Sequence, residues 1–196
     1  MAHIDNIGAG MFSDMSISTD PAGIPDLDGL DDAATQLALD ALFKAETDVP
    51  AVGSYSRVEN VREFPAMGTP PNVVNVPIYG QATSQQIQGQ ADAPSMELQL
   101  NAVPADWAAG ATLGDMVGDG VQRVFRFSLL NSKPEGYNSS IEVGSGLGDV
   151  QNSYYYWFGK IDAQQITPQL TDANTMTITM TIQSEFFGAY TATDAT

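Results

Sequence analysis

A strict alternation of apolar and polar side chains between residues 95 and 102 constrains the fold more than any other feature of this sequence. Side chains along a β-strand point to opposite faces with a period of two, so this stretch predicts a strand with one buried face and one wet face. Residues 175–185 repeat the pattern. The apolar positions of the two stretches are Met96, Leu98, Leu100, Ala102, Met176, Ile178, Met180 and Ile182, and the polar positions are Ser95, Glu97, Gln99, Asn101, Thr175, Thr177, Thr179, Thr181, Gln183 and Glu185.

Four further strands are expected over residues 54–64, from Val73 onward, and over residues 121–131 and 153–166, where β-branched and aromatic residues are bounded by Gly, Pro and Asn. Residues 81–91 are rich in Gln and are either a hairpin tip or a protruding loop. We favour the protruding loop, since a strand this polar has no inward face to fix its register. In the 153–166 strand, alternation places Tyr155, Trp157, Ile161 and Ala163 on one face and Lys160, Asp162 and Gln164 on the other.

Two helices are expected beside these strands, over residues 31–46 and, as a shorter element, over residues 104–120. The apolar stripe of the first helix either covers a face of its own sheet or docks on an adjacent subunit. The predicted fold class is therefore mainly β, a β-sandwich or half-open barrel with one packed α-helix and a second short helix. The stripe consists of Ala34, Leu37, Ala38, Ala41, Leu42 and Ala45.

The 196 residues suit one domain with an appended arm. Residues 1–29 are Gly, Ser, Asp and Pro with scattered apolar residues, which predicts an irregular N-terminal arm, followed by a single β domain over residues 30–196 that includes the helix 31–46. Ten acids precede residue 49, against Lys44 alone. The arm is either a solvated acidic tail or a segment that orders against a neighbouring subunit.

Composition excludes several function classes. The formal net charge is −17 and only seven residues are Lys or Arg; because nucleic-acid affinity comes mainly from such cations, a tight nucleic-acid binder is not expected. The absence of cysteine excludes disulfides, zinc-thiolate sites and cysteine nucleophiles. The start of the chain does not have the pattern of a signal peptide, and no apolar run reaches membrane-spanning length, so we expect assembly in a cytoplasm and no membrane partner.

No constellation of residues predicts catalysis, a cofactor or a metal. The Gly-rich run 144–148 precedes an aromatic strand instead of a helix, unlike a dinucleotide fingerprint, and is expected to be a loop. Asp26, Asp28, Asp31 and Asp32 do not have the spacing or the closing Glu of an EF-hand. His3, next to the chain start, is the only histidine. Asp115 and Asp119 do not stand out from the many other acids. Residues 154–158, YYYWF, are interpreted as strand packing in preference to a sugar- or base-stacking platform.

Three runs of the sequence, FPAMGTPPNVVNVPIYG, GQADAPSMELQLN and NTMTITMTIQSEFFGAY, carry a resemblance to a known family. Across roughly Val58 to Tyr190, the chain resembles the tail tube proteins of tailed bacteriophages, most closely those of long non-contractile tails. The resemblance extends over whole strands and includes no short signature.

This resemblance implies a non-enzymatic structural subunit of the virion tail, assembled in the host cytoplasm. Its copies would form hexameric rings stacked into a tube, with the sheets of neighbours joined into a ring-shaped inner β-barrel and a negatively charged lumen that conducts DNA during ejection without binding it specifically. The implied partners are further copies of the chain, the tape measure protein and the tail terminator and baseplate proteins. Strands with one polar face and a surplus of acids agree with this expectation.

Two groups of residues are candidates for these roles. Residues on the polar sides of the best strands are expected to face the lumen: Glu97, Gln99, Asn101, Asp162, Gln164, Gln183 and Glu185. Residues of the polar loop are expected to contact the next ring: Gln81, Ser84, Gln85, Gln86, Gln88 and Gln90. The N-terminal arm is expected to share in these ring-to-ring contacts.

Two alternative functions remain open from the sequence. A soluble glycan- or receptor-binding β-sandwich would use the aromatic strand and the long 133–152 loop. Another virion structural protein, such as a capsid decoration or tail-completion protein, would share the β-rich composition but not the assembly into extended tubes.

Overall fold

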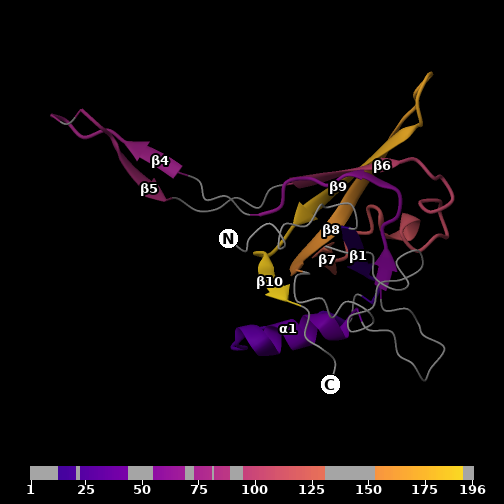
Figure 1. Ribbon diagram of the computed structural model, residues 1–196, viewed down its shortest axis with the longest axis horizontal. Helices are drawn as coiled ribbons and strands as arrows, with labels where there is room; N and C mark the ends of the chain where they lie inside the picture. The colour runs from indigo at the N-terminus through magenta and orange to yellow at the C-terminus, as the bar shows by residue number, and fades with distance from the viewer. Residues whose placement is uncertain are drawn as a thin grey trace, which may run out of the picture.

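The computed structural model describes residues 13–20, 23–43, 55–68, 73–80, 82–88, 95–130 and 153–191. Eight strands form one antiparallel sheet, and two more form a separate hairpin (Figure 1). The main sheet contains β1 (Asp14–Ser18), β2 (Tyr55–Arg57), β3 (Val61–Glu63), β6 (Ser95–Asn101), β7 (Arg123–Leu129), β8 (Ser153–Thr167), β9 (Thr175–Ile182) and β10 (Phe187–Thr191); the hairpin contains β4 (Val73–Val76) and β5 (Gln85–Gln88). The mainly β fold class predicted from the sequence is confirmed.

The order of the strands in the main sheet is β2-β1-β7-β8-β9-β6-β3, and β10 pairs with β8. The two ends of this path, β2 and β3, are consecutive in the chain and are separated only by Val58, Glu59 and Asn60. The single strand expected over residues 54–64 is thus two short strands. Asn60 adopts a left-handed conformation with φ of 60° at the break. This short segment pairs with β1 on one side and β6 on the other, so it brings the margins of the sheet together.

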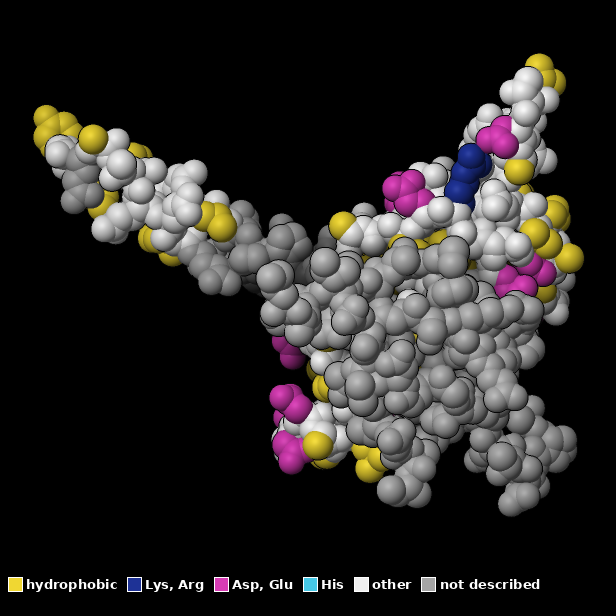
Figure 2. All heavy atoms as spheres, viewed as in Figure 1, with side chains coloured by type: hydrophobic (Ala, Val, Ile, Leu, Met, Phe, Trp, Pro, Cys, Tyr) yellow, Lys and Arg dark blue, Asp and Glu magenta, His cyan; other side chains and the backbone are white. Residues whose placement is uncertain are grey.

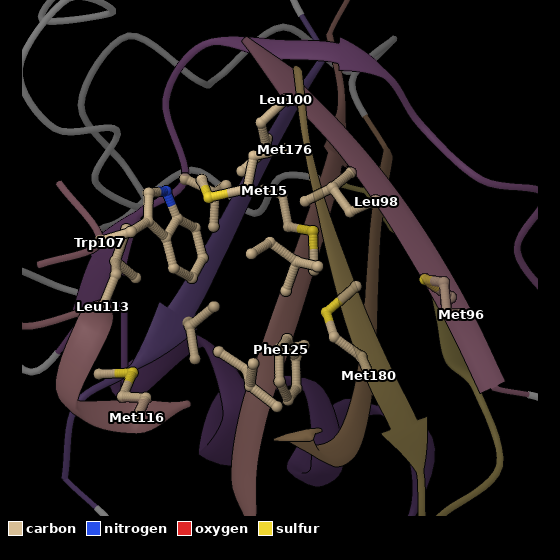
Figure 3. Close-up of a cluster of buried hydrophobic side chains, with 14 of the residues drawn as sticks. Met15, Met96, Leu98, Leu100, Trp107, Leu113, Met116, Phe125, Met176 and Met180 are labelled. Atoms are coloured by element: carbon tan, nitrogen blue, oxygen red, sulfur yellow. The ribbon is translucent and has the colours of Figure 1, made fainter. Parts of the chain in front are cut away.

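The main core lies inside the rolled sheet. Met15 of β1 and Leu100 of β6 belong to one buried cluster although three strands separate them in the sheet order, and Figure 3 shows them close together near Met176. The alternation of β6 and β9 supplies the apolar positions predicted above, since Met96, Leu98 and their counterparts on β9 are all nearly inaccessible to solvent. Phe125 and Trp157 stack in parallel with ring centroids 5.6 Å apart.

The segment between β6 and β7 covers one side of this core. Trp107, Leu113 and Met116 point into the cluster from successive turns (Figure 3). The only helical element here is a single 3-10 turn, η2 (Gly114–Met116), so the short helix predicted over residues 104–120 is limited to these three residues. A Cβ at Gly114 would lie 2.1 Å from the carbonyl oxygen of Ala108. Only glycine therefore fits at this position, where the backbone packs closely against the preceding turn.

Helix α1 (Asp32–Ala41) packs on the outside of the sheet, over β7 and the first half of β8 (Figure 1). The Asp31 side chain accepts a hydrogen bond of 2.8 Å from the Ala34 amide, as expected for an N-cap. Residues 42 and 43 form a turn and residues 44–50 lie outside the described residues, so the predicted extent to residue 46 is not reached within the described part of the chain.

The buried face of α1 differs from the predicted alanine-rich stripe. Thr35, Leu39 and Asp40 are buried, while Leu37 is 65% exposed. Because the alanines bury little area, the larger anchors Leu39 and, just after the helix, Phe43 decide which face meets the sheet. Within the described residues the helix covers a face of its own sheet.

Strand β1 lies inside the segment 1–29, which the sequence predicted to be an irregular arm. All five of its residues are buried, including Asp14 and Ser16. The sequence DMSIS alternates polar and apolar residues, but here both faces are covered, one by the core and one by residues packed beneath α1. The polar side chains were misleading because their partners, Arg57 and Arg126, are distant in the chain.

Among the described residues, no helix is long and apolar enough to cross a membrane.

Candidate assembly surfaces

Strands β6, β9 and the second half of β8 form a three-stranded sheet. One side of it is polar and is covered by no helix of the described residues, and we call it the polar face. Residues directly opposite each other in antiparallel strands point to the same side of a sheet. Glu97 lies opposite Thr179, Gln99 opposite Thr177 and Asn101 opposite Thr175. The three side chains of β6 are exposed, and the threonines are half-buried between the neighbouring strands. Three of the predicted lumen-facing residues therefore share one face.

A β-bulge at Asp162 changes which residues of β8 join the polar face. Ile161 lies opposite Met180, whereas Ala163 lies opposite Thr179, so Asp162 is an extra residue without an opposite partner on β9. One extra residue exchanges the faces of everything that follows it. The polar face is built from four rows of opposite residues: Ser95–Thr181–Lys160, Glu97–Thr179–Ala163, Gln99–Thr177–Gln165 and Asn101–Thr175–Thr167.

The bulge corrects two predictions made from strict alternation. Ala163 does not share a face with Trp157 and Ile161, and Gln164 does not share a face with Lys160 and Asp162. Gln164 lies opposite Ile178, in a row that continues the core face, although its own side chain is exposed because the strand extends beyond the core. Gln165, which strict alternation would put on the opposite side, replaces Gln164 on the polar face.

Asp162 itself stays on the polar face. The Thr181 hydroxyl donates a hydrogen bond to its carboxylate, and the Lys160 ammonium lies 3.4 Å from the other carboxylate oxygen. Both members of this ion pair are one-third exposed, so the pair contributes little stability. With Glu97, the polar face carries two acids and one base among its exposed or half-exposed residues.

The remaining two lumen candidates, Gln183 and Glu185, lie beyond the end of β9, and both are exposed. The Gln183 amide donates a hydrogen bond of 2.7 Å to the carbonyl of Phe158, so the backbone here still follows β8. The Ser184 hydroxyl lies next to them and accepts a hydrogen bond from the Phe158 amide. These contacts hold the turn between β9 and β10 but do not bring the two side chains into the rows described above.

Two margins beside the polar face lack a partner strand among the described residues. Strand β7 pairs with β8 only as far as Gly159, and the Gly118 amide then donates to the Ile161 carbonyl. From Asp162 to Thr167 this side of β8 faces no described strand. The second margin is the outer side of β3, which ends the strand order. Unpaired backbone groups along such margins are ready to pair with another chain.

The β8–β9 hairpin and the β4–β5 hairpin both project from the body of the molecule (Figure 1). We call them the ribbon (residues 162–177) and the arm (residues 73–88). The ribbon continues strands of the main sheet. Strands β4 and β5 pair only with each other, and Val73, Val74 and Ile87 are about half exposed. Hydrophobic side chains stand at the ends of both projections (Figure 2).

The predicted ring-stacking residues lie on or beside the arm. Ser84, Gln85 and Gln86 are exposed, and Gln86 lies opposite Asn75. Gln88 pairs with Val73 through its backbone. Gln81 and Gln90 lie outside the described residues. Since Gln85–Gln88 is a strand, the interpretation of residues 81–91 as a loop is wrong for these four residues: cross-strand pairing to the β-branched β4 sets a register that the polar sequence alone does not specify.

A buried polar layer joins α1 to the sheet. The Tyr156 hydroxyl donates to Asp40 of α1, and the guanidinium of Arg126, fully buried, lies 4.6 Å from the centre of the Phe43 ring. Burial, reinforced by the nearby Asp40 carboxylate and only partly opposed by Arg126, raises the pKa of Tyr156 well above its ordinary value. The layer is a structural contact: it ties three distant segments together.

Asp14 extends this layer toward β2. Its carboxylate accepts hydrogen bonds from Arg57 and from the Ser16 hydroxyl. Burial raises the pKa of Asp14, although Arg57 and then Arg126 lower it in part. The pair with Arg57 offsets much of the cost of burying a carboxylate.

The other candidate sites hold structural roles or lie outside the described residues. Asp115 accepts from the Gly110 amide and Asp119 from the Val121 amide and Arg123. Asp31 caps α1, and Asp26 accepts from the Asp28 amide. His3 and the run 144–148 are not described. No group of three or more metal-binding side chains occurs among the residues that are described.

The aromatic run of β8 is divided between two cores. Tyr154 and Tyr156 are buried beneath α1, and Trp157 is buried in the main core. The interpretation of these rings as strand packing is confirmed, and none of the three is available for stacking on a sugar or a base.

Comparisons of the chain with known proteins gave matches among solved structures. No protein-family model and no curated protein sequence matches it. Among solved structures, the chain is similar to a chain of the SPP1 tail tube, determined by solid-state NMR and cryo-EM, with a TM-score of 0.44 and 16% identity over 74% of each chain. It is also similar to a chain of the anti-feeding prophage baseplate, with a TM-score of 0.43 and 12% identity over 73% of this chain and 88% of that chain.

Proposed function

We propose that this protein is the structural subunit of a phage tail tube, in which hexameric rings stack into a hollow cylinder that conducts DNA. The observation that carries the proposal is the polar face of β6, β9 and β8, which, within the described part of the chain, no helix covers and two unpaired strand margins border. A sheet of this kind is suited to continue into a neighbour and to present one wet side to a channel. The sequence resemblance points to the same function.

Strand direction supports joining through the two unpaired margins. Each neighbour in the series β3-β6-β9-β8 is antiparallel to the next. Copies related by rotation about a tube axis keep the same strand directions, so the β8 margin of one copy is antiparallel to the β3 margin of the next. The alternating series then continues around the ring without interruption, and both margins gain backbone hydrogen bonds.

In this arrangement the polar face lines the bore. Glu97, Gln99, Asn101 and Asp162 are then lumen-facing, and Gln165 joins them in place of Gln164. Gln183 and Glu185 lie at the rim where β9 ends. The polar face carries hydroxyl and amide groups, and its one base, Lys160, is paired with Asp162. Phosphates therefore find little cationic charge there, and a threaded duplex slides past without adhering.

The arm is proposed to contact the neighbouring ring through Gln81, Ser84, Gln85, Gln86, Gln88 and Gln90, and the N-terminal residues are proposed to share in this contact. An isolated two-stranded hairpin is marginally stable in water. The exposed Val73, Val74 and Ile87 give it an apolar surface that a neighbouring subunit would cover. As a tail tube subunit the protein is a structural component of the virion and not an enzyme, and its remaining proposed partners are the tape measure, terminator and baseplate proteins.

Cysteine accessibility tests the assignment of the bore, because the chain contains no native cysteine. Purified Gln99→Cys protein is concentrated, checked by electron microscopy for tubes, and treated with a small maleimide or with a maleimide attached to a particle wider than the tube interior. We expect only the small reagent to label Gln99→Cys in tubes, whereas both reagents label Gln99→Cys in dissociated subunits. Ala33→Cys, on the exposed side of α1, is the control that both reagents label in either state.

Two results would contradict the proposal. If only globular monomers are seen at every concentration and ionic strength, the protein does not form a tube. If tubes form but the bulky reagent labels Gln99→Cys as fast as Ala33→Cys, the tube proposal stands and the polar face lies on the outside of the tube.

A further inference from the structure

An apolar pocket of about 380 Å³ opens at the end of the molecule where β8 begins. Its walls come from the loop after β3, the end of β7, the start of β8 and the turn into β10. Every lining residue is uncharged, and most are large and apolar. They are Pro65, Met67, Gly68, Phe127, Leu129, Tyr155, Phe186 and Gly188.

An apolar knob stands at the other end of the same strand. After β8 ends at Thr167, the ribbon turns through residues 168–174, and Leu170 in this turn is 100% exposed. Ile166 on the adjoining strand is 54% exposed. Figure 2 shows hydrophobic side chains at the end of the upright projection, which is the ribbon of Figure 1. Leu170 and Ile166 together give the end of the ribbon an exposed apolar surface, which is typical of a contact surface.

The pocket and the knob cannot meet within one subunit. Tyr155 lines the pocket and Thr167 precedes the knob, and at about 3.3 Å per residue the strand between them spans on the order of 40 Å. A second copy displaced along β8 by roughly that length would bring its knob to the first copy's pocket. A contact between two different patches, repeated from copy to copy, produces an open-ended series.

Charge favours a second copy as the occupant. Each chain carries a formal net charge of −17, so copies repel one another over most of their surfaces. Every residue that lines the pocket is uncharged, and Leu170 and Ile166 of the knob are apolar. The nearest acid on the knob, Asp172, forms an exposed ion pair of 3.0 Å with Arg62, a residue of β3. The two patches therefore meet where repulsion is smallest.

The knob fits the pocket better than the end of the arm does. The ribbon continues β8 and β9, which belong to the main sheet, so its direction is set before contact is made. Strands β4 and β5 have no pairing to the main sheet that would fix the arm in the same way, and Tyr79 at its turn has a larger side chain with a polar hydroxyl.

We propose that Leu170 of one copy inserts into the Met67–Phe127–Tyr155 pocket of a second copy, forming the axial contact between successive copies of the tube. This inference rests on the proposed function and names one contact between successive rings of the proposed tube. It adds a site that the arm and the N-terminal residues do not provide.

A cysteine pair tests the contact directly. In tubes of the double variant Leu170→Cys, Met67→Cys, oxidation is expected to link each chain to two neighbours, giving a ladder of covalent multimers on a non-reducing gel. The two positions are too far apart within one chain to bridge. Each single variant, and the pair Leu37→Cys, Met67→Cys, is expected to give no ladder, since Leu37 is an exposed leucine on the opposite side of the sheet.

A charge substitution supplies a second measurement. Leu170→Glu is expected to raise the protein concentration needed for tube growth by about tenfold or more, since each contact loses a buried leucine and gains a charge. Leu37→Glu adds the same charge on α1 and is expected to change this concentration less than about twofold.

The outcomes separate this inference from the proposed function. If the unmodified protein never forms tubes, the proposed function fails. If it forms tubes, but the double variant gives no ladder in them and Leu170→Glu polymerises like Leu37→Glu, the function stands and the knob-and-pocket contact is overturned. A ladder that persists after removal of residues 73–88 would show that the contact does not depend on the arm.

Discussion

At the scale of single residues, the position of Asp162 decides the chemistry of the candidate channel. Strict alternation along β8 puts Gln164 beside Asp162 on the polar side. Because Asp162 is an extra residue, Gln165 lies there instead. The rest of the candidate set on β6 was identified from alternation alone, because Glu97, Gln99 and Asn101 belong to a strand without a bulge.

Removing the bulge residue provides a prediction at this scale. Deletion of Asp162 leaves Ile161 opposite Met180 and Ala163 opposite Thr179, so the register of β8 and β9 is kept. We expect the protein to fold with a loss of about 1–2 kcal/mol in the free energy of unfolding, from the lost hydrogen bond to Thr181, measured by urea denaturation.

Deletion of Thr179 is the control for that experiment. Strand β9 is central and pairs with both β6 and β8, so losing one residue turns part of its apolar set to the polar side. This variant is expected not to fold cooperatively. Equal stability of the two deletion variants would contradict the bulge assignment.

At the scale of elements, two projections of similar outline differ in how they are supported. The ribbon shares its strands with the main sheet, whereas β4 and β5 have only each other. The alternation rule recognised β9 because one side of it is buried, and it failed for β5 because neither side of the arm is buried in the subunit. The polar Gln85–Gln88 acquires its conformation by pairing with β4.

Hydrogen exchange measures this difference in support. In dissociated subunits we expect backbone amides of β4 and β5 to exchange at least about tenfold faster than those of β9, since an isolated hairpin opens at little cost in free energy. In tubes the arm amides are expected to become protected, and those of β9 to change little. Arm amides that are equally protected in both states would exclude a role for the arm in assembly.

At the scale of the whole molecule, the charge of −17 sets the conditions under which copies associate. Each added subunit brings like charge to a growing assembly, and salt screens that repulsion. Tube growth is therefore expected to accelerate when ionic strength rises from about 0.01 M to about 0.15 M, which shortens the Debye length from roughly 30 Å to roughly 8 Å.

Light scattering and electron microscopy check this expectation. A neutral osmolyte at the same osmolarity is the control and is expected to leave the growth rate nearly unchanged. Slower growth at higher salt would mean that ion pairs between copies, and not uncharged contacts such as the knob and pocket, drive assembly.

The sequence by itself determined those features that depend on neighbours in the chain. Period-two patterns identified β6 and β9 and their buried sides, and helical spacing of apolar residues within 31–46 identified α1. The acid surplus and the absence of cysteine excluded whole classes of function without any structure.

Tertiary structure alone decided what depends on contacts between distant segments. β1 is a strand because Arg57 and Arg126 satisfy its polar side chains. α1 turns its Leu39 side, and not its alanine stripe, to the sheet because Val124 and Tyr156 of the sheet pack with Leu39 and Tyr156 donates a hydrogen bond to Asp40. The bulge at Asp162 and the pocket at the far end of β8 have no local pattern, because pairing and packing between strands far apart in the chain create them.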